Sequence, residues 1–323
     1  MIINGGLNFT GTMKYNGSAL NLEYIADDYR NGLTLTKGYI GGGYISNAGW
    51  TVVTTIQNST DTWGTSANAN LSTAFRYGAW ASSHINGYVM YADFGSYLMN
   101  KKMAFSNETV SAIGNRSYGS SNPYFFQHGI GYNPDGTFYG TKAYSTANSS
   151  TNYDILSFTS DTWSTKSDAN IYSANYAVYC WAWFDKNYGF SVASDNVTRR
   201  YPFSTETWAT LSCAPDVTYS MSAWGKALPT KDAKTYVHIG DIRSPFMKFM
   251  HLTSSYVTNA YSQTLNNDEQ SPVMGQSHGY WAGGYNGAQN AHTDRVEYNT
   301  DTVIQINDAP RALSSGAPMW SGY

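Results

Sequence analysis

The chain has 323 residues, of which only 13% are charged, and its net charge is −3. Without a basic run it lacks the electrostatic footprint of a nucleic-acid-binding protein, and no apolar stretch approaches the roughly 20 residues of a membrane helix. Abundant Tyr, Trp and Thr favour strands while Gly and Asn favour tight turns, so the composition predicts an all-β protein.

The cysteines, the histidines and the first residues carry no sign of a disulfide framework, a metal site or secretion. Cys180 and Cys213 are the only cysteines, and Cys180 lies in an apolar run that predicts a buried position. The six histidines show no paired metal spacing, so we expect neither a metal nor another cofactor. The first residues lack the positive region and apolar core of a secretory signal, which predicts a soluble protein made in a cytosol.

A six-residue motif with an acidic turn followed by threonine recurs along the chain. Its clearest copies read Phe158-Thr-Ser-Asp-Thr-Trp163, Phe203-Ser-Thr-Glu-Thr-Trp208 and Tyr298-Asn-Thr-Asp-Thr-Val303. In chain order the seven copies begin at Tyr15, Asn58, Phe105, Phe158, Phe203, Leu252 and Tyr298. Spacings of about 40–53 residues are typical of the blades of a β-propeller.

Each copy follows a strand that combines an aromatic or apolar residue with small residues. These strands are expected at 2–6, 38–43, 87–92, 137–140, 188–191, 236–240 and 279–284. A further apolar strand precedes them, for example at 77–81, 177–183 and 221–227. Glycine inside a strand predicts close backbone approach where blades converge. Each unit therefore predicts four strands, and the acidic turn joins the third strand to the fourth.

The two ends of the chain predict how the ring closes. Residues 317–323 have the pattern of an inner strand without partners, whereas residues 2–3, 12–15 and 19–25 have the pattern of three strands without an inner one. Joining them removes two exposed sheet edges. We therefore expect one domain over residues 1–323, an all-β, seven-bladed propeller of four-stranded antiparallel blades that is closed by the C-terminal inner strand joining the N-terminal strands.

The repeats resemble a known family. Gly-Tyr-x-Gly-Gly, a hydrophobic strand and Asp/Glu-Thr-Trp are similar to the kelch repeat. The last unit, with Gly279-Tyr-Trp-Ala-Gly-Gly, Asp294-Arg-Val-Glu-Tyr-Asn-Thr-Asp-Thr-Val303 and Pro310-Arg-Ala-Leu-Ser-Ser315, resembles the kelch-like repeats of marine tailed-phage virion proteins. Because kelch-like propellers share no single function, the resemblance implies a scaffold for binding.

Two classes of propeller enzyme are disfavoured by the residues. The acidic turns lack the glycine that a sialidase Asp-box places between Asp and Thr-Trp, and the arginines are scattered along the chain instead of forming a carboxylate clamp. A copper oxidase of the galactose-oxidase type needs a Cys-crosslinked Tyr and two His ligands. We therefore predict no enzymatic activity and no catalytic residue.

The longer connections, at 44–49, 141–152, 164–173 and 256–271, are expected on one face of the ring. This face is predicted to carry aromatic side chains among Ser, Asn and Gly, a composition typical of recognition surfaces and suited to uncharged sugars. The alternative is that these side chains pack between blades. The candidate ligand-binding residues are Tyr44, Trp50, Tyr97, Tyr144, Tyr261 and Tyr285.

These features predict a non-enzymatic phage virion protein, associated with a tail or fibre and made in the host cytoplasm. Its expected partners are a host cell-surface glycan or neighbouring virion proteins, with a homo-oligomer in the particle as one arrangement, and neither nucleic acid nor membrane insertion. The alternatives are a cellular kelch-like adaptor or lectin and, less favoured, a glycan-active propeller enzyme.

Overall fold

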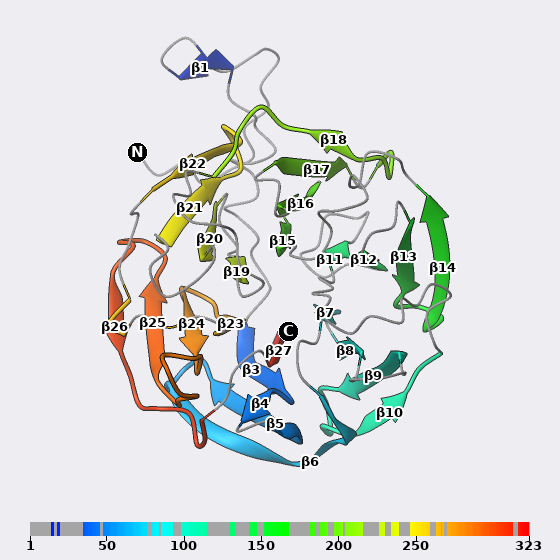
Figure 1. Cartoon of the computed structure of the whole chain (residues 1–323), viewed down its shortest axis with the longest axis vertical. Coiled ribbons are helices and arrows are strands. Elements are labelled where there is room, and N and C mark those ends of the chain that lie inside the picture. Colours follow the sequence, from blue (N-terminus) through cyan, green and yellow to red (C-terminus); the bar gives the residue numbers. More distant parts are fainter. Residues whose placement is uncertain are drawn as a thin grey trace, which may run out of the picture.

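The computed structural model shows an all-β chain with its sheets arranged around a central axis (Figure 1). The structure describes residues 14–15, 18–19, 35–45, 48–75, 79–83, 85–92, 98–114, 130–132, 142–146, 152–167, 181–184, 188–192, 197–202, 204–215, 226–229, 234–238, 246–258, 263–265, 267, 270–312 and 316–322.

Five four-stranded antiparallel sheets follow one another in chain order, and each has its strands in sequence order from the axis outward. Blade 1 contains β7 (Ala79–Ser82), β8 (Asn86–Ala92), β9 (Leu98–Ala104) and β10 (Val110–Ala112). Blade 2 contains β11 (Ile130–Tyr132), β12 (Lys142–Thr146), β13 (Asn152–Ser157) and β14 (Thr162–Ser167). Blade 3 contains β15 (Trp181–Phe184), β16 (Tyr188–Val192), β17 (Thr198–Pro202) and β18 (Ala209–Thr210). Blade 4 contains β19 (Lys226–Pro229), β20 (Lys234–His238), β21 (Phe246–Met250) and β22 (Ser255–Val257). Blade 5 contains β23 (Ser271–Met274), β24 (His278–Ala282), β25 (Thr293–Glu297) and β26 (Val303–Gln305).

A further, five-stranded sheet joins the two ends of the ring, and we call it the closing sheet. Its order is β27 (Ala317–Gly322), β3 (Leu35–Gly41), β5 (Ala48–Gln57) and β4 (Tyr44–Ile45), with β6 (Thr62–Phe75) also paired to β5. The inner strand β27 contacts β23 of blade 5 on one side and β7 of blade 1 on the other. Residues 317–322 therefore form the inner strand of a sheet, as predicted.

The predicted count of seven four-stranded blades is wrong. The C-terminal strand pairs with β3, opposite Gly38, Tyr39 and Ile40, and not with strands at residues 2–25. Of that first unit the structure describes only β1 (Lys14–Tyr15) and β2 (Ser18–Ala19), a two-stranded sheet outside the ring (Figure 1). The copy that begins at Tyr15 lies in this two-stranded sheet, where Tyr15 pairs with Ser18.

The acidic turns join the third strand of a sheet to the fourth, as predicted, and they share one backbone conformation. Apart from glycines, the described residues with positive φ are Asp61, Glu108, Asp161, Glu206, Ser254 and Asp301, with φ between 47° and 57°. Short polar side chains tolerate this left-handed conformation best. Ser254 takes the fourth position of the motif, so the motif of blade 4 begins at His251 and not at Leu252, where the sequence placed it.

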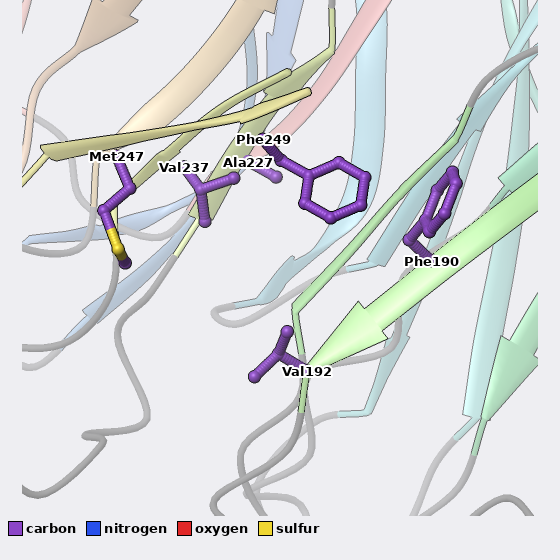
Figure 2. Close-up of a cluster of buried hydrophobic side chains, with 6 residues drawn as sticks. All are labelled: Phe190, Val192, Ala227, Val237, Met247 and Phe249. Carbon is purple, nitrogen blue, oxygen red and sulfur yellow. The ribbon is translucent and has the colours of Figure 1, made fainter. Parts of the chain in front are cut away.

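Glycines in the second strands permit close approach between neighbouring sheets, as predicted. A Cβ on Gly38 would overlap the side chain of Val273 on the inner strand of blade 5, and a Cβ on Gly279 would lie 2.8 Å from Cδ2 of Leu228 in blade 4. The core lies between the sheets. Figure 2 shows Phe190 of β16 beside Phe249 of β21, with ring centroids 4.9 Å apart across the boundary between blades 3 and 4.

Candidate functional site

The acidic turn residues bind side chains of the preceding sheet, in an arrangement that we call a clasp. In blade 5, the Asp301 carboxylate accepts hydrogen bonds from the Tyr236 hydroxyl of blade 4 at 2.6 Å, from Lys234 Nζ at 3.0 Å and from Lys248. Burial favours the neutral carboxyl, but these donors outweigh it and lower the pKa of Asp301. The turn is therefore an electrostatic joint between two sheets.

The same clasp recurs around the ring. Asp161 of blade 2 accepts from the Tyr88 hydroxyl at 3.2 Å and from Lys102, both of blade 1. Glu108 of blade 1 accepts from the Tyr39 hydroxyl at 3.3 Å and from Lys37 of the closing sheet. Glu206 of blade 3 pairs with Lys166 of blade 2. The sequence predicts these acids only as turn formers.

The clasp between blade 5 and the closing sheet includes an arginine and a histidine. Asp61 accepts from the Tyr280 hydroxyl at 2.7 Å and pairs with Arg295, and His278 lies 3.5 Å from the same carboxylate. Burial and the neighbouring Asp61 charge raise the pKa of Tyr280. Burial lowers the pKa of His278 despite that charge. These groups join blade 5 to the closing sheet.

Tyr285 lies at the tip of the connection between β24 and β25, and of the six candidates it is the one whose side-chain exposure the structure describes. It follows Gly283 and Gly284, whose φ values of 68° and 115° turn the chain sharply, and it forms an antiparallel bridge with Gln289. The base of this hairpin is buried, whereas Tyr285 is 37% exposed and the next three residues are exposed. An aromatic ring thus stands in solvent beside amide groups.

The closing sheet repeats this hairpin. Gly42 and Gly43 have φ values of 62° and 110°, and Tyr44 then pairs with Gly49. The amide of Gly42 donates to Val52 at 3.1 Å, just as that of Gly283 donates to His292 at 2.7 Å. The double glycine therefore determines the same turn in two neighbouring sheets, and a tyrosine follows in each.

Buried amides hold the Tyr285 hairpin against the long connection after blade 4. Asn267 donates to the Gly283 carbonyl at 3.2 Å and accepts from Asn290 Nδ2 at 2.9 Å. Nearby, the fully buried Asp294 accepts from both the amide and the hydroxyl of Thr264, at 3.0 and 2.5 Å. These bonds make the hairpin a preorganised part of blade 5.

Thr264, His292 and Asp294 have the residue types of a hydrolase triad but not its geometry. His292 Nε2 lies 2.7 Å from the Thr264 hydroxyl and 3.1 Å from Asp294 Oδ1. In a triad the base contacts the nucleophile with one ring nitrogen and the orienting carboxylate with the other. Here a single nitrogen faces both groups, and the carboxylate binds the hydroxyl directly, so the cluster anchors a loop.

Of the other predicted ligand-binding residues, the structure places Tyr44, Trp50 and Tyr144 in strands. Tyr44 lies in β4 and Trp50 in β5, and within the predicted loop Tyr44 and Ile45 pair with Gly49 and Ala48. Tyr97 and Tyr261 lie outside the described residues. The predicted connection at 141–152 contains β12, and the one at 164–173 begins inside β14. The connection after β22 (Ser255–Val257) is irregular wherever it is described up to residue 270, as predicted.

Tyr144 lies in the second strand of blade 2 and not in the predicted loop. The register of β12 against β13 pairs Ala143 with Leu156, just as Gly38 of β3 pairs with Ile56 of β5. Tyr144 therefore occupies the second-strand position of the clasp tyrosines Tyr39, Tyr88, Tyr236 and Tyr280. A short Lys/Asn/His-x-Tyr pattern before each acidic turn is the signal that could have identified these positions.

No protein-family model matches the chain, and neither does any curated protein sequence. Among the residues that the structure describes, no group of three His, Cys, Asp or Glu side chains could hold a metal ion, and no helix is long and apolar enough to span a membrane.

Proposed function

We propose that this chain is a non-enzymatic binding propeller of a phage virion, located on a tail or fibre, and that its Tyr285 hairpin contacts a host surface glycan. The observation that supports binding is the exposed Tyr285 ring on a hairpin whose base is buried and hydrogen-bonded. A rigid aromatic contact loses little conformational entropy on binding. Placement in a virion rests on the resemblance of the repeats.

A neutral sugar is the ligand class that the hairpin suits best. The Tyr285 ring offers a face to the apolar side of a pyranose, while the exposed Asn286 and the half-buried Gln289 offer donors and acceptors to its hydroxyls. The charged groups of the clasps are already committed to the boundaries between sheets. Contact with a neighbouring virion subunit is the competing use of the same tip.

The test is binding of the purified chain to a glycan array and to host envelope preparations. Tyr285→Ala is expected to weaken a saturable interaction roughly tenfold, as the loss of an aromatic anchor does, and to leave the melting temperature unchanged. Ile304→Ala is the matched control, because Ile304 is an exposed apolar residue on the outer strand of the same blade. Equal binding by wild type and Tyr285→Ala would rule out the hairpin as the glycan site.

Placement in the particle is tested separately by cryo-EM of virions. Density for the ring at the tail or fibre is expected. Particles without such density would contradict the virion assignment but leave the binding result standing. Density in which the Tyr285 hairpin is buried against another subunit would favour an architectural role over receptor binding.

A further inference from the structure

The boundary between blades 3 and 4 departs from the other clasps in two matched positions. In the second strand of blade 3, Phe190 stands where blade 1 has Tyr88, and both lie opposite a cation on the third strand, Arg200 and Lys102. In the turn of blade 4, Ser254 stands where the other turns carry Asp or Glu. The tyrosine hydroxyl and the carboxylate are therefore missing together, while the cation remains.

Ser254 has the same place in space as the acids, as its turn and its neighbours indicate. Its φ is 47°, and the flanking Thr253 and Ser255 hydroxyls lie 2.6 Å apart. The corresponding pair around Asp161, Ser160 and Thr162, also lies 2.6 Å apart. The backbone of a clasp turn is thus intact, but its anionic side chain is absent.

A ring pair crosses this boundary as at the other clasps, but here the two rings are T-shaped, whereas the pairs Tyr39–Phe105, Tyr88–Phe158 and Tyr236–Tyr298 are stacked. His251, the first residue of the blade 4 motif, has its ring centroid 5.2 Å from that of Phe190. In the clasp between blades 1 and 2, Phe158 and Tyr88 are 4.6 Å apart. Figure 2 places Phe190 and Phe249 at this boundary. From the equivalent strand and turn positions, we infer that Ser254 faces Arg200 as Asp161 faces Lys102.

Arg200 occupies the position of a clasp cation, but the matching turn carries Ser254 instead of an acid. Its equivalent in blade 5, Arg295, pairs with Asp61 across the boundary and with Glu297 two residues along its own strand, the latter at 2.7 Å. For Arg200 the corresponding residues are Ser254 and Pro202. Its guanidinium packs over the Tyr188 ring at 4.7 Å, and its buried Nε, like that of Arg295, has no hydrogen-bond partner within the described part of the chain.

We propose that this boundary binds a carboxylate anion from solution, held by the Arg200 guanidinium and the Ser254 hydroxyl in the place of the missing acidic side chain. A guanidinium matches a carboxylate with two parallel N–H donors, and the serine adds a third. The site is within reach of solvent, because the turn acids of the other clasps are 14–28% exposed. Both Arg200 and Ser254 are likewise partly exposed.

The carboxylate has two sources that present the same chemistry: a free small anion, or an acidic sugar within a glycan. Acetate probes the first and glucuronate the second, with glucose as the uncharged control. Binding of glucuronate at least tenfold tighter than acetate would identify the acidic sugar as the ligand. Equal affinities for the two would identify the carboxylate group alone. The neutral-sugar site at Tyr285 is separate, so either site can fail without the other.

The experiment is a titration of the full chain with sodium acetate at constant ionic strength. The heat of binding is measured by calorimetry, and the melting temperature is measured at each acetate concentration. A saturable rise in melting temperature of about 1–2 °C is expected at ligand concentrations several times the dissociation constant. Arg200→Gln is expected to abolish the acetate response. Ser254→Asp is expected to raise the melting temperature without acetate and to abolish the response as well, because the new side chain fills the site.

The control variant is Lys102→Gln, which removes the cation of an ordinary clasp whose anion is internal. It is expected to lower the melting temperature and to keep the acetate response. Absence of a saturable acetate response in the wild type would overturn the proposal. So would equal responses in wild type, Arg200→Gln and Ser254→Asp.

Discussion

Replacement of Asp301 by Asn tests whether the clasps stabilise the ring. The asparagine keeps the preference for positive φ and an oxygen that accepts from Tyr236, but it removes the charge opposite Lys234 and Lys248. The two lysine side chains are 14% and 15% exposed and the Asp301 side chain is 25% exposed. The lysines would thus remain largely desolvated without a counter-charge.

The expected loss follows from these contacts. A hydrogen bond to a charged group contributes about 1.5–3 kcal/mol when buried and less where solvent screens it. Two partly screened lysine contacts predict a loss of about 2–3 kcal/mol. An unfolding entropy of about 2.1 cal/mol/K per residue over 323 residues converts this to a drop in melting temperature of about 3–4 °C.

The assay is differential scanning calorimetry, supported by urea unfolding where the transition is reversible. Asp308→Asn is the matched control, because it removes the same charge from an exposed position. Tyr236→Phe, alone and combined with Asp301→Asn, gives a double-mutant cycle that isolates the tyrosine bond. The reasoning is refuted if Asp301→Asn lowers the melting temperature no more than Asp308→Asn does.

Three further outcomes are expected. The pKa values of Glu108 and Asp301 lie below their usual 4.5 and 3.8. Their contribution to stability is therefore present above those usual values and is lost as the pH falls through the lower folded-state values. Urea unfolding between pH 7 and pH 3 should show this loss below about pH 4.5. Gly38→Ala should cost about 1–3 kcal/mol by overlap with the β-branched Val273, a loss that a urea midpoint would reveal and an unchanged midpoint would contradict. Thr264→Val removes a hydroxyl donor to a buried carboxylate and should increase hydrogen exchange in the connection that ends at residue 270, with the β25 amides as internal reference.

The sequence by itself determined the class of fold and the local rules of each blade. Strand-forming residues, turn-forming residues and the Asp/Glu-Thr motif predicted antiparallel strands joined by short acidic turns, because these preferences act over a few residues. Glycines such as Gly38 and Gly279 marked close approach between sheets. The C-terminal inner strand was predicted from its apolar pattern alone.

Only the tertiary structure decided the number of blades and the partners of the side chains. Repeat counting cannot distinguish a motif that ends a blade from one that forms an isolated hairpin, as at Tyr15, because closure depends on which strand meets β27 in space. The clasps were equally beyond sequence reasoning. Asp301 and Tyr236 are 65 residues apart in the chain. They are in contact because blades 4 and 5 pack side by side in the ring. The absence of a turn carboxylate opposite Arg200 was also decided by the tertiary structure, because it follows from comparing the Ser254 turn with the equivalent acidic turns at the other boundaries.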